Sequence, residues 1–347
     1  MKLSEFDYPL PKELIAQYPL EERDTARLLV LERKQCTTGH RIFKNIVDYF
    51  RQGDLIVLNN TKVLPSRLIG SRVTGGKVEL LLLRQKSGLT FDALIKPSRT
   101  KLKEKIIFTP LSLQRKDSSG QERAGLDGGK IYCEVTAKNE VTFLAKDRET
   151  IYSLGVMPLP PYIKRDSHDS DNLYYQTVYA QELGSIASPT AGLHFTEELI
   201  TQIKSRGVNI AYITLHIGYS TFKPVKSEDI TGHKMEKEYF QISKEAQGSI
   251  KQARLKKGRI FAVGTTVCRT LESYALGNKD GYTDLFIYPG YRFKMTDCLL
   301  TNFHLPRTTL FMLVCAFVGK KLIKKAYQEA IDKKYRFYSY GDAMLII

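Results

Sequence analysis

The feature that most constrains the fold is a change of sequence pattern between residues 66 and 155. Short runs rich in β-branched and aromatic residues follow one another there, separated by Gly, Ser or charged turns, at 77–83, 91–95, 106–108, 131–135 and 141–144. Closely spaced short strands of this kind are typical of a small antiparallel barrel or sandwich. A polar, glycine-rich stretch, 112–130, interrupts the series, and we expect it to form a long exposed loop.

On both sides of this segment the pattern alternates between strands and helices. Strands are predicted at 53–60, 208–215, 259–263 and 284–288, and helices after Thr196, from 265 to 275 and from 309 to 317. Such alternation is typical of an α/β sheet. We therefore expect an α/β main domain formed by residues 1–65 and 156–347, with residues 66–155 inserted as a small antiparallel β-barrel domain.

Composition narrows the class of protein. The chain has 347 residues, of which 42% are hydrophobic and 26% charged, as in ordinary globular proteins. The longest apolar run, 310–318, is about half of the roughly 20 residues that a membrane helix needs, so no membrane partner is expected. Glu5 and Asp7 lie where an export signal would be basic and apolar, so we expect no such signal. Five scattered cysteines argue against a disulfide framework or a zinc ribbon. A cytoplasmic protein is expected.

Positive charge is concentrated in two regions. The net charge is +16, and segments 66–155 and 241–347 contribute +7 and +10, whereas 156–240 carries −2. Basic runs such as 96–103 and 251–259 could form a cationic surface that attracts phosphates. A solvated surface is the more usual explanation of any single run, but two such regions favour a polyanionic partner.

Polar residues follow several of the predicted strands. Asn59 and Asn60 end the first, His216 follows another, and Thr265 and Thr266 come after the strand at 259–263. In α/β sheets, ligands bind at the carboxyl ends of strands. The turn at Gly264 precedes a helix, so its amides and the two threonine hydroxyls could hold a carboxylate or phosphate. Ordinary capping threonines are the alternative.

Histidines are the candidates for proton transfer, because imidazole titrates near neutral pH. His194 precedes a predicted helix, His216 closes a predicted strand, and His233 lies near acidic residues. For each, a structural histidine remains the alternative. The Walker, G-x-G-x-x-G, H-E-x-x-H and G-x-S-x-G patterns are all missing, which disfavours the common nucleotide, metal and nucleophile sites.

Several long strings resemble one family. They are Phe6-Asp7-Tyr8-Pro9-Leu10-Pro11, Leu14-Ile15-Ala16-Gln17, residues 23–30, Leu159-Pro160-Pro161-Tyr162-Ile163, residues 175–180, residues 189–196 and the tail 335–344. Together they are similar to the QueA family of queuosine biosynthesis, the S-adenosylmethionine:tRNA ribosyltransferase-isomerases. Several motifs in the same order make a chance match improbable.

The resemblance implies an enzyme that transfers and isomerises the ribosyl group of S-adenosylmethionine onto 7-aminomethyl-7-deazaguanine (preQ1) at the wobble position of tRNAs with GUN anticodons. Its products would be epoxyqueuosine-tRNA, adenine and methionine. S-adenosylmethionine is then a consumed substrate rather than a cofactor, and no metal or other cofactor is expected. The resemblance also implies an α/β body with an inserted β-barrel, acting as a monomer.

The resemblance also suggests roles for residues. His194 and His216 lie in matching blocks and are the acid–base hypotheses, while His233 and Glu238 carry over from the pattern His-x-Met-His-x-Glu. In that pattern Glu236 replaces the second histidine, and in the block 216–222 Ser220 replaces the second glycine. Both departures put the corresponding family feature in doubt at those positions.

The remaining site residues are assigned by chemistry. Asn59, Asn60, Thr265 and Thr266 are expected to hold polar groups of the methionine or ribose. Seven basic residues are expected to contact tRNA phosphates: Arg23, Arg27, Lys62, Arg67, Lys164, Arg165 and Arg307. Because arginine is also a common ion-pair partner, a structural role is the alternative for each.

Two other functions compete with ribosyl transfer. An RNA methyltransferase would use the same S-adenosylmethionine, but a glycine-rich turn after its first strand is missing here. A non-catalytic RNA-binding protein would explain the charge but not the motif-rich, nearly neutral middle of the chain.

Overall fold

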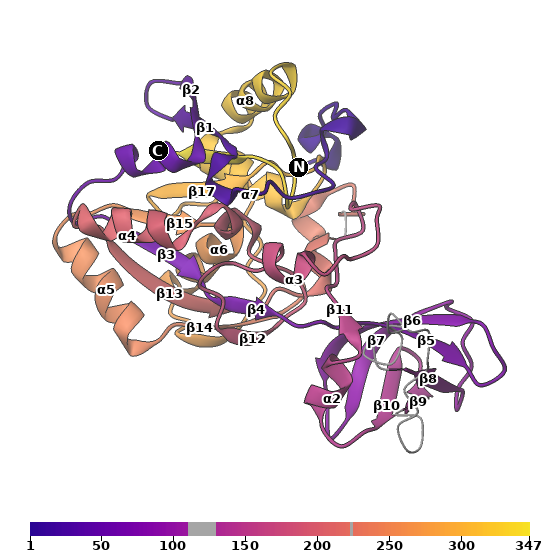
Figure 1. Ribbon diagram of the computed structural model, residues 1–347. Helices are drawn as coiled ribbons and strands as arrows, with labels where there is room; N and C mark the ends of the chain where they lie inside the picture. The colour runs from indigo at the N-terminus through magenta and orange to yellow at the C-terminus, as the bar shows by residue number, and fades with distance from the viewer. Residues whose placement is uncertain (110–129, 223–224) are drawn as a thin grey trace. The chain divides into compact units, whose positions relative to one another are not determined.

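The computed structural model describes residues 1–109, 130–222 and 225–347 and divides the chain into two compact units (Figure 1). The main unit comprises residues 1–62, 160–166 and 173–347, and the barrel unit comprises residues 63–159 and 167–172. The sequence placed the boundaries after residues 65 and 155, whereas the units change after 62 and 159. Most of the loop expected at 112–130 lies outside the described residues.

The barrel unit is a closed antiparallel barrel of six strands, as the sequence predicted. Its strands are β5 (Arg67–Arg72), β6 (Lys77–Gln85), β7 (Thr90–Lys96), β10 (Glu140–Leu144), β9 (Ile131–Ala137) and β8 (Lys105–Phe108), in that order around the barrel. Pairing of β5 with β8 closes it, and the short strand β11 (Gly155–Val156) adds to β5. Inward residues such as Leu80, Phe91 and Val141 are fully buried.

Strand β5 is the barrel strand that the sequence did not predict. Its central Gly70 lacks a side chain, and this weakens the alternation of apolar and polar residues that marks a strand. The structure explains the glycine: a Cβ at position 70 would lie 2.7 Å from the Ile107 carbonyl oxygen on β8. The missing side chain therefore allows the close approach of backbones where the barrel closes.

The main unit contains a mixed sheet of nine strands. Their order is β16 (Asp280–Thr283), β14 (Glu238–Gln241), β13 (Asn209–Leu215), β3 (Leu55–Asn59), β15 (Ile260–Val263), β17 (Cys298–Asn302), β18 (Ala343–Ile346), β1 (Arg27–Glu32) and β2 (Thr37–Ile42). The four central strands β13, β3, β15 and β17 are parallel. A two-stranded sheet pairs β4 (Thr61–Val63) with β12 (Glu182–Ser185). The expected mixed α/β architecture is confirmed.

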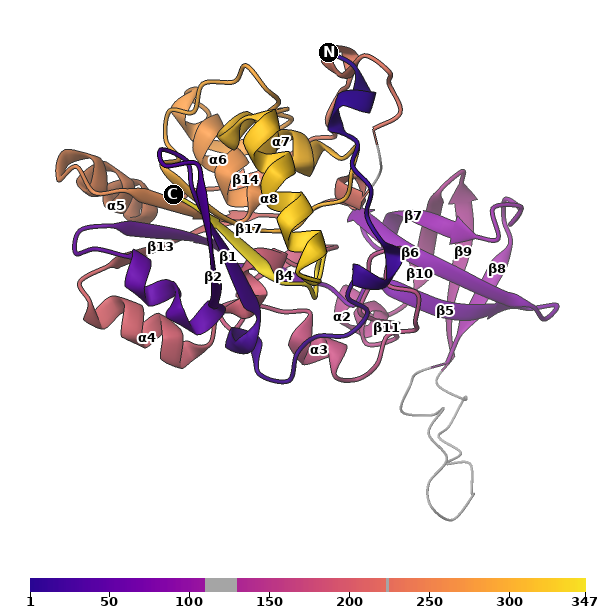
Figure 2. The same ribbon diagram turned by 90° about the horizontal axis from the view of Figure 1, so that it is seen from above.

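Helices cover both faces of this sheet (Figure 2). Buried residues of α5 (Lys244–Leu255), α6 (Thr265–Ala275), α7 (Thr309–Val318) and α8 (Lys320–Asp332) pack on one face, and those of α4 (Glu197–Ser205) and the 3₁₀ segment Phe43–Tyr49 pack on the other. Two short helices, α2 (Arg148–Tyr152) and α3 (Asp171–Tyr174), complete the set among the described residues. Thr196 caps α4 as predicted, because its hydroxyl accepts a hydrogen bond from Leu199 N at 3.1 Å.

The strand predicted at 284–288 is wrong. The strand in this region is β16, at 280–283, and residues 284–288 lie outside any strand. Leu285 N donates to the Thr283 hydroxyl at 3.2 Å, and Leu285 O accepts from Arg269 Nε at 3.0 Å. Side chains therefore form the hydrogen bonds with the Leu285 N–H and carbonyl that a neighbouring strand would otherwise have formed.

A buried carboxylate joins the starts of β3 and β15. Asp54 is 3% exposed and accepts hydrogen bonds from Arg51 N at 2.8 Å and Arg259 N at 3.1 Å. The Arg259 guanidinium adds a charged hydrogen bond at 2.6 Å. These contacts fix the relative register of two central parallel strands at their amino ends.

Replacing Arg259 with alanine should destabilise the main unit, because it leaves the Asp54 carboxylate buried without its cation. We expect Arg259→Ala to lower the free energy of unfolding by about 2 to 3 kcal/mol in urea denaturation. Arg148→Ala is the matched control, since Arg148 pairs with Glu149 on the surface, where an ion pair contributes little. Equal midpoints for the two variants would contradict this account of Asp54.

Candidate active site

The four parallel strands of the main sheet end at one edge. Asn59 and Asn302 are the last residues of β3 and β17, and His216 and Gly264 directly follow β13 and β15, so all four lie along that edge. Crevices at this edge are the usual ligand sites of α/β sheets. Most polar residues that the sequence singled out at strand ends therefore lie at a common edge.

A pocket opens beside the start of α6. It is lined by polar side chains from several segments far apart in the chain, namely Tyr162, Ser188, Thr190, Thr221, Thr265, Thr266, Thr301, Asn302, His304, Thr308 and Ser339, together with apolar residues such as Ile217 and Leu310. Among the described residues, no Asp, Glu, Lys or Arg side chain lines it. Hydroxyl and amide groups in an apolar wall are typical of sites for small molecules.

Two hydroxyls in this pocket lack protein partners. Thr266 Oγ1 and Ser188 Oγ are buried, and neither has a hydrogen-bond partner within the described part of the chain. Both residues are at least nine-tenths buried. An unsatisfied buried hydroxyl costs free energy, so two of them in one pocket indicate that a bound molecule supplies the missing hydrogen bonds.

The first turn of α6 adds a positive electrostatic end to the pocket. Gly264 precedes the helix with φ of +94°, a left-handed conformation that suits glycine. The N–H groups in a helix's first turn lack intrahelical partners and attract anions. Thr265 and Thr266, both predicted as ligand residues, therefore lie where a carboxylate would be stabilised.

His194 lies behind the pocket, at the end of a 3₁₀ segment (Thr190–His194). Its Nε2 accepts from Asn302 Nδ2 at 3.2 Å, and Asn302 Oδ1 accepts from the Thr190 hydroxyl at 2.8 Å. Thr190 and Asn302 both line the pocket. This arrangement assigns the His194 proton to Nδ1. Burial lowers the pKa of His194 to about 4, so the ring is neutral at pH 7.

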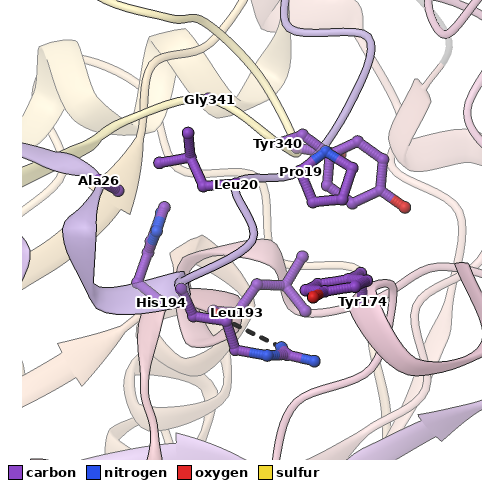
Figure 3. A pocket seen from close by; sticks show the side chains of 10 residues that line it. Pro19, Leu20, Ala26, Tyr174, Leu193, His194, Tyr340 and Gly341 are labelled. Atoms are coloured by element: carbon purple, nitrogen blue, oxygen red, sulfur yellow. Dashed lines mark hydrogen bonds between the residues drawn. The ribbon is translucent and has the colours of Figure 1, made fainter. Parts of the chain in front are cut away.

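His194 also lines a second, mostly apolar pocket (Figure 3). The figure shows its ring near Leu20 and Ala26, and Tyr174 and Tyr340 belong to the same lining. Ser339 lines both pockets. Ser339 therefore adjoins both pockets, and His194 contacts the polar pocket beside α6 through Asn302.

His216 lies at the carboxyl end of β13 but is not part of either pocket lining. Its Nδ1 is 2.8 Å from the Thr61 hydroxyl, and its ring stacks on Tyr239 with centroids 5.8 Å apart. A Cβ at Gly184 would come within 2.6 Å of His216 Nε2, so a glycine is required there to admit the ring. Burial lowers the pKa of His216.

Asn59 and Asn60 support the same edge rather than the pocket. Asn59 Oδ1 accepts from Thr61 N and Leu215 N, at 3.2 and 3.0 Å, and its Nδ2 donates to the Leu215 carbonyl. Asn60 Oδ1 accepts from the Thr214 hydroxyl at 2.7 Å. Both amides are committed to joining β3 and β13, and their predicted contact with substrate stays a prediction.

Comparison with known proteins identifies the family. Residues 3–346 match the family described as queuosine biosynthesis protein. A relative from Sulfurihydrogenibium, named S-adenosylmethionine:tRNA ribosyltransferase-isomerase, is 52% identical with all of both chains covered, and one of the same name from Caldanaerobacter subterraneus is 49% identical, again with all of both chains covered. The chain belongs to this family. The crystal structure of S-adenosylmethionine tRNA ribosyltransferase from Thermotoga maritima is 35% identical, with a TM-score of 0.55, and covers 99% of this chain and 100% of that one.

Glu238 is buried in an ion pair. One oxygen accepts from Gly218 N at 3.0 Å and the Thr221 hydroxyl at 3.1 Å, and the other is 2.5 Å from Arg269 Nη1 on α6. Because Thr221 lines the pocket, Glu238 fixes part of the pocket wall to α6. These contacts give Glu238 a positioning role, and a direct part in proton transfer stays a prediction.

His233 stands apart from both pocket linings. Its ring lies edge-on to Phe286, with centroids 5.2 Å apart, and partial burial lowers its pKa. The side chain of Ser220, the other departure from the family pattern, is outside the described residues.

Most of the predicted phosphate ligands have partners inside the protein. Arg23 donates to the carbonyls of Leu173, Gln176 and Leu193; Arg27 pairs with Asp342; Arg67 pairs with Glu79; Arg165 donates to the Gln17 carbonyl; and Arg307 pairs with Asp7. Lys62 and Lys164 have exposed side chains. Arg307 is exposed as well, with a side chain that is 53% accessible. Contact with tRNA stays a prediction for all seven.

The sequence analysis missed several residues of the pocket. Ser188, Thr190 and Asn302 were not selected, although Asn302 ends β17 as Asn59 ends β3. The same strand-end signal could have identified Asn302. Ser188 and Thr190 flank Pro189 in an irregular segment, where no periodicity marks an inward side chain.

The structure gives two further observations about ligands and membranes. No group of three or more His, Cys, Asp or Glu side chains within residues 1–109, 130–222 and 225–347 is arranged to hold a metal ion. Across those same residues, none of the helices combines the length and apolar character that spanning a membrane requires.

The Glu238–Arg269 pair can be tested by Glu238→Gln. The substitution leaves the Arg269 guanidinium buried without a counter-charge, so we expect the free energy of unfolding to fall by about 2 to 4 kcal/mol in urea denaturation. If Glu238 also positions Thr221, KM for S-adenosylmethionine should rise more than kcat falls. A large loss of kcat with unchanged KM would instead indicate direct proton transfer by Glu238.

The buried neutral His194 predicts a dependence of stability on pH. Its pKa is about 4 when folded, against 6.5 for an unperturbed histidine, so the unfolded chain binds the proton more readily. The stabilisation is therefore present above pH 6.5 and is lost as pH falls toward 4. In urea denaturation, the free energy of unfolding should fall less between pH 7 and pH 4.5 for His194→Gln than for the wild type. An equal fall in the two proteins would contradict this.

Proposed function

We propose that this chain transfers and isomerises the ribosyl group of S-adenosylmethionine onto preQ1 at the wobble position of tRNAs with GUN anticodons. The observation that carries the proposal is family membership over the whole chain, at about half identity to full-length relatives of that name. A pocket with two unpartnered hydroxyls beside a helix N-terminus supports it, because the substrate brings a carboxylate, an ammonium and ribose hydroxyls.

The pocket beside α6 is proposed to bind S-adenosylmethionine. Its carboxylate would lie at the first turn of α6, near Thr265, where the helix dipole favours a negative charge. The hydroxyls of Thr266 and Ser188 would bond polar groups of the methionine or the ribose. Because the described part of the lining holds no charged side chain, the sulfonium would be bound among neutral dipoles.

The reaction requires proton transfers at three stages. A base removes a proton next to the positive sulfur, adenine leaves with a proton, and the amine of preQ1 attacks the sugar carbon. His194 and His216 are proposed for this work. His194 is favoured because its hydrogen-bond partner Asn302 lines the pocket, and a neutral imidazole has a nitrogen able to accept a proton once the Asn302 bond is released.

The basic surfaces are proposed to hold the anticodon stem-loop. Residues 66–155 and 241–347 carry most of the net positive charge, and Lys62 and Lys164 are exposed cations of the main unit. Binding of this kind weakens as salt rises, because phosphate contacts release counterions. We also propose that the enzyme acts as a cytoplasmic monomer and needs no metal or added cofactor.

One assay tests the reaction. The protein is incubated with S-adenosylmethionine and tRNA carrying preQ1, and the small molecules are separated. Adenine and methionine in equal amounts are expected. S-adenosylhomocysteine would indicate methyl transfer instead, and unchanged S-adenosylmethionine would indicate binding without chemistry; either result would overturn the proposal.

The role of His194 is tested by His194→Ala. Loss of an acid–base group should lower kcat by about 100-fold or more, while the Kd for tRNA changes little. His168→Ala is the control, since His168 is exposed and the sequence gives it no role. Full activity of His194→Ala would eliminate His194 and leave His216 as the candidate.

A further inference from the structure

Three aromatic rings form a row across adjacent strands of the main sheet. Tyr239 on β14 lies directly opposite Tyr282 on β16. His216 lies just past the end of β13, and its backbone N–H donates to the Tyr239 carbonyl at 2.9 Å. The centroids are 5.8 Å apart for His216 and Tyr239, and 5.7 Å apart for Tyr239 and Tyr282. We call these three residues the aromatic row.

The aromatic row lies on the solvent side of this part of the sheet. Side chains alternate between faces along a strand, and Leu215 and Phe240, the neighbours of His216 and Tyr239, are fully buried. Tyr239 is 37% exposed and Tyr282 is 62% exposed. Tyr239 on β14 and Tyr282 on the edge strand β16 lie on the open side of the sheet and contribute little to the core, so packing does not explain them.

The aromatic row begins at the reaction edge of the sheet. His216 follows β13 at the same edge as Asn302 and the start of α6, and the row runs from there toward the edge strand β16. A polynucleotide whose target base reaches this edge would place neighbouring bases along the row. Exposed aromatic rings on a sheet are a common platform for unpaired bases.

We propose that the aromatic row stacks unpaired bases of the tRNA anticodon loop next to the modified position. The inference rests on the proposed function for its RNA partner and adds the surface that reads the single-stranded loop. Lys237 and Asp280, two residues before Tyr239 and Tyr282, are both exposed and of opposite charge. These two charges offset each other, and Glu182 adds a negative charge near His216, so stacking rather than phosphate attraction supplies the contribution of the row.

The experiment exploits the lack of tryptophan in this chain. Tyr282→Trp introduces a single indole into the aromatic row, and stacking on a base quenches indole fluorescence. An anticodon stem-loop RNA should quench this variant, whereas a blunt duplex of the same stem should not. Tyr132→Trp is the control, because Tyr132 is 38% exposed on the barrel unit and outside the row.

Alanine variants measure the contribution to affinity. Tyr239→Ala and Tyr282→Ala should each weaken binding of the stem-loop by about 5-fold to 100-fold, with unchanged Kd for S-adenosylmethionine. Tyr132→Ala should leave both constants unchanged. Because Tyr282 is exposed, thermal unfolding of its variants should match the wild type, so weaker binding cannot be attributed to misfolding.

Several outcomes would overturn the proposal. Equal quenching by the duplex, quenching by S-adenosylmethionine alone, or a change in emission with protein concentration would assign the row to a duplex, to the adenine or to a second copy of the chain. Unaltered stem-loop affinity in both alanine variants would also overturn it. Release of adenine and methionine by the wild type is scored separately, so failure of the row leaves the proposed reaction standing, and failure of the reaction is seen independently.

Discussion

The parallel alignment of four central strands is the constraint on which the site depends. Asp54 and Arg259 fix β3 against β15 at their amino ends, so the opposite ends of those strands finish at one edge. That edge then holds Asn59, Gly264 and Asn302 without any one of them being placed by a local motif. The chemistry of the pocket is a consequence of strand register, which is set far from the ligand.

Buried polar contacts then turn the edge into a defined pocket. Glu238 connects α6 to the segment carrying Thr221, and Asn302 connects His194 to Thr190. Each contact uses hydrogen-bonding groups that would be costly if left unpaired. In the lining of this pocket, the Thr266 and Ser188 hydroxyls have no partner among the described residues and remain available to a ligand.

The sequence predicted elements whose signals are local. The side chain of Thr196 caps α4 and marks its start, and the turn at Gly264 marks the start of α6. Residues 284–288 were predicted wrongly because their apolar side chains resemble those of a strand, whereas the Leu285 carbonyl is bonded by Arg269 on helix α6. Strand β5 was not predicted for a similar reason. A glycine is needed at position 70 because β8 approaches closely there, and the sequence around β5 does not show that contact.

The same distinction applies to the site. Thr265 and Thr266 were found because they directly follow a strand, but Ser188 acquires its importance only when the chain folds. Conversely, Arg23 and Asn59 looked like ligand residues, and the structure shows their polar groups bonded to main-chain atoms. Local chemistry identifies which groups can bind, while tertiary contacts decide which of them remain available.

The pairing of β1 with β18 has a consequence for synthesis of the chain. β1 lies near the amino end, and its parallel partner β18 comprises residues 343–346, so the main sheet acquires this strand only after nearly the whole sequence has been made. All six strands of the closed barrel lie between residues 67 and 144, and they are available much earlier. On the ribosome, the barrel can therefore fold first, whereas the main sheet is completed only when β18 has been synthesised.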